Sequence, residues 1–308
     1  MSPSTPDGGG VAHAPSSGRA GSGALGSGTE VGAVRLTVSD LGRSRSFYEH
    51  VLGLRAAELE DGGVVLGPAG GPTLVELAPD ASASPLDHRT TGLFHLAILV
   101  PTRRDLAHAL ARMAQARWPL DGASDHLVSE ALYLSDPDGN GIEIYRDRPR
   151  EDWTRDDAGQ LAMATLRLDL NDLAGELDGE TEIAPRMAAG TRMGHVHLQV
   201  AELESTEAFY SGVLGFDVTV RGYPGALFFS AAGYHHHIGT NTWHSAGSSP
   251  PPPGAIGLRS FDVVLEDQAE LDRVLARIAA AGLTTEPVAG SGSSVRDPSG
   301  NAVVLRRA

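Results

Sequence analysis

The chain contains neither cysteine nor lysine among its 308 residues. Without cysteine it can form no disulfide, thiolate nucleophile, iron–sulfur cluster or cysteine-ligated zinc site. Without lysine it can form no Schiff base, and it lacks the phosphate-binding lysine of nucleotide-binding loops. Any metal ion must therefore bind to histidine, aspartate or glutamate.

Long apolar segments and positive charge are also scarce. The longest apolar runs, such as LFHLAILV, are far shorter than the roughly 20 residues that span a bilayer. The first 30 residues are rich in Gly, Ser, Ala and Pro and are predicted to be a disordered tail rather than a secretory signal. With 24 Lys+Arg against 39 Asp+Glu, the net charge of −15 disfavours nucleic acid and anionic membranes as partners. We expect a cytoplasmic location.

The chain repeats itself. The segments VGAVRLTVSDL and GRSRSFYEHVLGL return as MGHVHLQVAEL and ESTEAFYSGVLGF, and the turns SDPDGNGIEIYR and RDPSGNAVVLRR echo one another. Periodicity predicts four βαβββ modules, at about residues 31–80, 92–148, 193–242 and 257–307. We expect a tail (1–30), a first domain (31–148), a linker (149–192) and a second domain (193–308).

Several histidines fall in predicted strands of the second and third modules. His195 and His197 are two residues apart and share one face of a strand, His95 begins another strand, and Glu143 lies in a third. Two imidazoles and one carboxylate from three strands form a facial triad, which binds divalent iron, manganese or zinc and leaves positions open. The triad requires the second and third modules to face each other. In the alternative, these are buried histidines bonded to the backbone and an edge-strand charge.

The equivalent positions in the first and fourth modules carry no ligand. Ala33 stands in the place of His195, about Ser260 in that of His95, and Val304 in that of Glu143. The pattern predicts that one site has been kept and its pseudo-symmetric counterpart lost.

Four further residues are candidates for catalysis. In the run YHHHIGTNTW, strand alternation favours His237 as a fourth ligand or acid–base group, although a structural cluster is the alternative. His197 is a second candidate for proton transfer. Tyr145 shares the face of Glu143 and could bond a substrate oxygen, and His126 could serve as a base beyond the metal ligands.

Four segments together, TTGLFHLAILVP, GASDHLVSEALYLSDPDGNGIEIYRDRP, MGHVHLQV and GYHHHIGTNTW, resemble the vicinal oxygen chelate superfamily, and within it two-domain bacterial catechol-2,3-dioxygenase-like proteins. The resemblance implies an α+β fold in which four βαβββ modules form two domains with cupped mixed sheets. It also implies that His195, His95 and Glu143 match the metal ligands of extradiol enzymes. The fourth ligand of glyoxalase I, a glutamate, matches about His237.

From the resemblance and the triad we expect a ferrous extradiol dioxygenase that cleaves a catechol-type aromatic with dioxygen, although the same ligands accept Mn²⁺. A glyoxalase-like isomerase or lyase is the alternative within the fold. A metal-free binding or resistance protein is the alternative from another class. A homodimer is left open.

Overall fold

The computed structural model of the chain describes residues 24–308 except residues 157, 158 and 291. Each of the four predicted modules forms one βαβββ unit, as the sequence pattern predicts. The first module contains β1 (Glu30–Val38), α1 (Leu41–His50), β2 (Arg55–Glu58), β3 (Val64–Gly67) and β4 (Val75–Pro79). The second contains β5 (Gly92–Leu99), α2 (Arg103–Ala116), β6 (Gly122–Asp125), β7 (Ser129–Ser135) and β8 (Gly141–Asp147).

The second half of the chain repeats this order. The third module contains β10 (Arg192–Gln199), α4 (Leu203–Glu207) continued by the π-helical η2 (Ala208–Leu214), β11 (Asp217–Val220), β12 (Ala226–Ser230) and β13 (Ile238–Asn241). The fourth contains β14 (Gly257–Leu265), α5 (Gln268–Ala280), β15 (Glu286–Val288), β16 (Gly292–Arg296) and β17 (Ala302–Arg307). Between the halves lie η1 (Arg150–Asp152), β9 (Leu166–Arg167) and α3 (Leu170–Gly175).

The helices begin where the sequence supplies capping side chains. The Asp40 carboxylate accepts from the backbone N–H of Arg43 at the start of α1, and Thr102 forms a capping box with Asp105 at the start of α2. The Asp267 carboxylate accepts from the backbone N–H of Glu270 at the start of α5. These side chains satisfy amide groups that the first helical turn leaves without partners, and so they fix where each helix starts after its strand.

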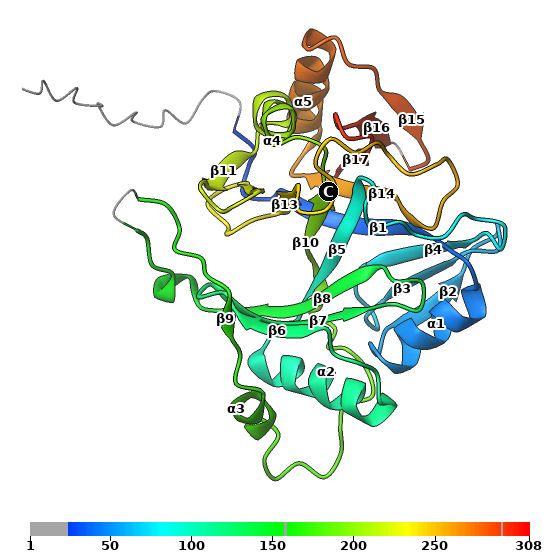
Figure 1. The fold of residues 1–308 in the computed structure, drawn as a ribbon, viewed down its shortest axis with the longest axis vertical. Coiled ribbons are helices and arrows are strands. Elements are labelled where there is room, and N and C mark those ends of the chain that lie inside the picture. The colour runs from blue at the N-terminus through cyan, green and yellow to red at the C-terminus, as the bar shows by residue number, and fades with distance from the viewer. Residues whose placement is uncertain (1–23, 157–158, 291) are drawn as a thin grey trace, which may run out of the picture.

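The modules combine across the two halves of the chain. The first sheet has the strand order β15-β16-β17-β14-β1-β4-β3-β2 and joins the first module to the fourth. The second sheet, β11-β12-β13-β10-β5-β8-β7-β6-β9, joins the second module to the third. In both, the central strands pair antiparallel, β1 with β14 and β10 with β5, and Figure 1 shows α2 on the outer side of β6, β7 and β8. The expected α+β class with four modules and mixed sheets is confirmed.

Contacts within each half explain why the repeats share both their beginnings and their ends. The Tyr48 hydroxyl, from α1, donates to Asp136 in the turn before β8 at 3.2 Å. The Tyr210 hydroxyl, from η2, donates to Asp297 in the turn before β17 at 2.9 Å. Each buried tyrosine thus joins the first helix of a half to its last turn. The domain boundaries at 148 and 193 stay a prediction.

The segments outside the modules are partly packed. Residues 1–23 of the predicted tail lie outside the described residues, but Leu25 is buried and its N–H donates to the carbonyl of Gly215 at 3.2 Å. The linker contributes β9, which pairs with β6 at the edge of the second sheet. In the described part of the chain, no helix is long and apolar enough to cross a membrane.

Candidate metal centre

The central strands of the second sheet bring three predicted ligands together. His95 lies opposite His197 in the β5–β10 pair, and Ala97 lies opposite both His195 on β10 and Glu143 on the parallel β8. Because side chains alternate along a strand, His95, His195 and Glu143 point to the same face. One donor atom from each lies within 4.8 Å of the other two, and all three residues are buried.

The geometry of the three groups fits a divalent cation. The Nε2 atoms of His95 and His195 lie 3.0 and 3.2 Å from the same oxygen of Glu143. Although it is buried, His95 Nε2 has no hydrogen-bond partner in the described structure. Nitrogen lone pairs and a carboxylate that converge in this way form a donor set for Fe²⁺, Mn²⁺ or Zn²⁺.

The protonation states also suit a metal. Burial lowers the pKa of His195 to about 4, so its imidazole is neutral near pH 7 and keeps a lone pair. Burial alone would raise the pKa of Glu143. The adjacent His195 and His95 outweigh that effect and hold the pKa of the carboxyl well below its ordinary value. The site therefore offers two imidazoles and one carboxylate anion.

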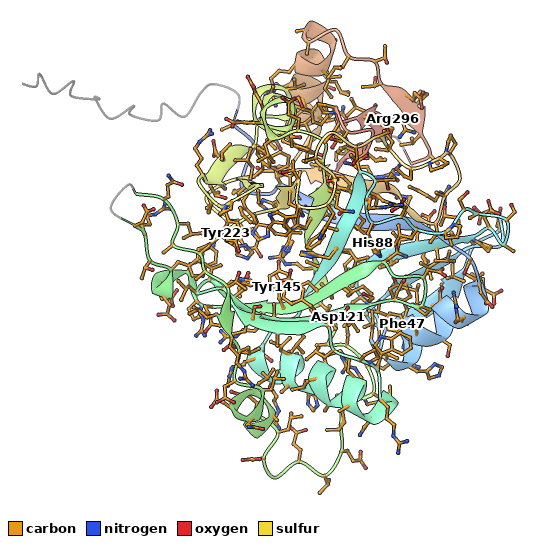
Figure 2. All side chains as sticks on the ribbon, viewed as in Figure 1. Phe47, His88, Asp121, Tyr145, Tyr223 and Arg296 are labelled. Carbon is orange, nitrogen blue, oxygen red and sulfur yellow. The ribbon has the colours of Figure 1, made fainter. Side chains whose placement is uncertain are left out.

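The triad lies in a cavity of about 530 Å³. This volume falls within the range of small-molecule sites, roughly 300 to 1,000 Å³. Aromatic side chains form much of its wall: Phe94, Tyr133, Tyr223, Phe228 and Trp243. In Figure 2 the lining residues Tyr223 and His88 are labelled on the left and on the right of the view, with Tyr145 between them. The cavity is suited to a flat, largely apolar ligand that reaches the triad.

The position of a fourth ligand is occupied by glycine. In the second module Glu143 lies opposite Ala97, and in the third Gly239 takes the equivalent position, opposite His197. A Cβ atom on Gly239 would lie 3.0 Å from the imidazole of His197. His197 is buried, lines the cavity and fills the space that a fourth side chain would need. Gly239 therefore offers no fourth donor beside His95, Glu143 and His195.

The expectation for His237 differs from the structure. Its Nδ1 accepts from the backbone N–H of Ala231 at 3.1 Å, and the residue does not line the cavity. The reason is local: β13 begins only at Ile238, so the histidine run is a loop to which strand alternation does not apply. The structure places His237 outside the group of ligands.

The sequence analysis missed His236, the middle residue of that run. It lines the cavity, and its ring centroid lies 4.1 Å from that of His195. Its Nδ1 lies 2.8 Å from Nδ1 of His235, whose Nε2 lies 2.9 Å from Asp147. Because a carboxylate only accepts, His235 Nε2 carries the hydrogen in its contact with Asp147.

Tyr133 was also missed, and it connects His126 to the triad. His126 donates through Nδ1 to the carbonyl of Ala164, so its Nε2 accepts from the Tyr133 hydroxyl, both at 2.7 Å. Tyr133 lies opposite Glu143 in the β7–β8 pair, and its ring packs beside His95. The pairing of these strands is the signal that could have identified Tyr133. The structure places His126 on the cavity wall, and its role as a base stays a prediction.

Tyr145 lies beside the triad but does not line the cavity. Its hydroxyl bonds that of Tyr234 at 2.7 Å, and its ring centroid lies 4.9 Å from that of His195. A Cβ atom on Gly194 would overlap the Tyr145 hydroxyl, so this glycine makes room for it. Tyr145 therefore packs against His195, and its contact with a substrate stays a prediction.

A family model matches both halves of the chain. Residues 30–144 and 192–305 match the Glyoxalase/Bleomycin resistance protein/Dioxygenase superfamily. The chain is also 44% identical over 279 residues to a protein of Bacillus subtilis (strain 168) named catechol-2,3-dioxygenase, which covers 90% of this chain and 96% of the relative.

Solved structures share the fold at low sequence identity. A Bacillus subtilis protein named provisionally as a dioxygenase has a TM-score of 0.62 at 16% identity, over 92% of this chain and 85% of its own. Glyoxalase I of Zea mays has a TM-score of 0.55 at 16% identity, over 90% and 92%. These likenesses show the fold alone.

Proposed function

Because the chain belongs to the glyoxalase/bleomycin resistance protein/dioxygenase superfamily, we propose that it is an extradiol dioxygenase that cleaves a catechol-type aromatic ring with dioxygen. The observation that carries the proposal is the convergence of His95, His195 and Glu143 on one point of an aromatic-walled cavity. The 44% identical relative named catechol-2,3-dioxygenase supports the same reaction.

We assign the resident metal as ferrous iron held by these three side chains, with Mn²⁺ as the other ion that the donor set accepts. The bound ion would supply open positions for substrate and dioxygen and a route for electrons between them. Gly239 at the fourth position supports this assignment, because three protein ligands leave more of the coordination sphere open than four. The same glycine weighs against the glyoxalase-like alternative.

The remaining residues bind the substrate and move its protons. The walls formed by Phe94, Phe228 and Trp243 orient a flat ring and exclude water. His236 is the side chain placed to accept a proton from a catechol hydroxyl, since it lines the cavity and its ring centroid lies 4.1 Å from that of His195. His197, whose Nε2 has no hydrogen-bond partner in the described structure, remains a candidate for a second proton acceptor.

The test is anaerobic loading of the full chain with ferrous iron, followed by exposure to catechol and air. We expect oxygen uptake in step with a yellow ring-opened product. The metal-free protein is the control and should consume no oxygen. If none of several catechols causes oxygen uptake, the dioxygenase proposal fails and an isomerase or lyase, which consumes no oxygen, replaces it. If the protein retains no metal, both enzyme hypotheses fail and the protein is a metal-free binding protein.

The cellular location and the oligomeric state need separate measurements. We propose a cytoplasmic location, which cell fractionation would check. We also propose that the protein is a homodimer, and light scattering on the purified protein would measure the mass of the assembly.

A further inference from the structure

Apart from its histidines, the charged side chains that line the cavity are of one sign. Its described lining residues include two carboxylates, Glu143 and Asp121, and no arginine. The chain has no lysine to supply a cation instead. Arg89 follows the rim residue His88, but it is exposed and donates two hydrogen bonds to Asp87. A metal ion held by the triad would neutralise Glu143 and leave Asp121 as the remaining fixed charge.

Asp121 stands at a defined distance from the triad. Tyr133 on β7 lies opposite both Glu143 on β8 and Gly122 on β6, so Gly122 is two strand spacings from the ligand, about 10 Å. Asp121 directly precedes Gly122 and accepts from the Ser135 hydroxyl at 2.7 Å, a contact that leaves its charge uncompensated. In Figure 2 it lies on the same side of the view as His88, away from Tyr223. A ring bound at the triad would direct a short substituent toward this end.

We propose that the cavity selects catechols by the charge of this substituent: it prefers an amine, accepts an uncharged group and rejects a carboxylate, and Asp121 is the specificity-determining residue. The inference rests on the proposed function, since it places the two catechol oxygens at the triad. A substituent carboxylate would lie near Asp121 with no arginine or lysine in the described lining to pair with. An ammonium group would gain a counter-ion and the Ser135 hydroxyl as a second acceptor.

The experiment compares three catechols of similar size, which bear an aminoethyl, an ethyl or a carboxyethyl group. Dissociation constants are measured without oxygen on the iron-loaded full chain, so that binding is read apart from turnover, and kcat/KM is then measured in air. We expect the amine to bind about ten-fold more tightly than the carboxylate, because Asp121 is exposed, and the attraction of the amine and the repulsion of the carboxylate then each contribute less than about 1 kcal/mol.

Two variants test the residue. Asp121→Asn keeps an acceptor for Ser135 but removes the charge, so the ratio of amine to carboxylate affinity should fall about ten-fold. Asp217→Asn is the matched control, since it removes the same charge from exposed β11 at the opposite edge of the sheet and should leave the ratio unchanged. An unchanged ratio in Asp121→Asn, or the same fall in Asp217→Asn, would overturn the assignment.

The outcomes separate this inference from the proposed function. Binding in the expected order without ring cleavage supports the charge selection and overturns the dioxygenase. Cleavage of all three catechols with equal kcat/KM and equal dissociation constants supports the dioxygenase and overturns the charge selection. If none of the three binds, both fail.

Discussion

The two sheets have equivalent strand orders but opposite ways of balancing charge. In the first sheet Arg35 donates to Asp262 at 2.7 and 3.1 Å and to Glu76 at 3.1 Å. Arg306 donates to Asp262 from the neighbouring strand at 3.2 Å. The carboxylates on this face are therefore paired with guanidinium groups of the protein itself.

In the second sheet, the buried carboxylate of Glu143 contacts imidazoles instead of guanidinium groups. Register places His197 where the first sheet has Arg35, and Gly239 where it has Glu76. Among the described residues, no arginine pairs with Glu143, which contacts His95 and His195 instead. A buried carboxylate that no guanidinium group pairs with favours a cation from outside the chain. The comparison shows that one fold can close a site with internal ion pairs or keep it open for a metal.

The largest expected effect comes from removing the charge of Glu143 in the second sheet, and removing the charge of Glu76 in the first sheet is the control. Glu143→Gln keeps the side-chain volume but removes the anionic ligand, so the iron-loaded protein should lose its metal and its oxygen uptake should fall to background. Glu76→Gln, the matched change in the first sheet, should retain one equivalent of iron. Metal analysis and an oxygen electrode measure both. A Glu143→Gln protein that keeps its iron would contradict the ligand assignment.

A second variant separates the histidine loop from its counterpart. The loop before β4 of the first sheet carries Pro72, Thr73 and Leu74 where the second sheet has its three adjacent histidines. His236→Gln should lower kcat about 100-fold, the usual contribution of a general base, while metal content stays unchanged. The neighbouring His237→Gln lies outside the cavity and should retain kcat within about two-fold. Equal losses of kcat in the two variants would contradict a role for His236 as a general base.

Acid should destabilise the metal-free protein through the buried histidines of the second sheet. Burial lowers the pKa of His195 to about 4 and that of His237 to about 3, whereas an unfolded histidine titrates near 6.5. As the pH falls below 6.5, the unfolded chain therefore takes up protons first, and the free energy of unfolding declines down to about pH 4. His195 alone contributes on the order of 3 kcal/mol to this decline.

Urea unfolding of the metal-free protein at several pH values between 7.5 and 4 measures this effect. In His195→Asn the dependence on pH should be shallower. A free energy of unfolding that does not change over this range would refute the argument.

The smallest effect is expected in the first sheet. Arg35→Met removes one of two arginines bound to Asp262, while Arg306 remains. Because Arg35 is partly exposed, the loss of stability should be about 2 kcal/mol, less than for a fully buried pair. Urea unfolding measures it, and metal content and kcat should be unchanged. Loss of iron in this variant would show that the two sheets are coupled.

Much of the fold could be predicted because its signals are local and repeated. The periodicity of the sequence predicts a βαβββ order in each module, and the repeat predicts four modules of one kind. The donors His95, His195 and Glu143 follow from alternation within regular strands. The positions of His236 and Gly239 could not be predicted in this way, because His236 lies in a loop without strand alternation and Gly239 has no side chain that indicates a function.

The sequence by itself determined which residues could bind a metal and on which strand faces they lie, because strand alternation depends only on a residue's neighbours in the chain. Only the tertiary structure decided that β5 pairs with β10, whose residues are about 100 positions apart, rather than each half closing its own sheet. That choice depends on how the apolar faces of all four modules pack together, a balance over the whole molecule that no local pattern contains.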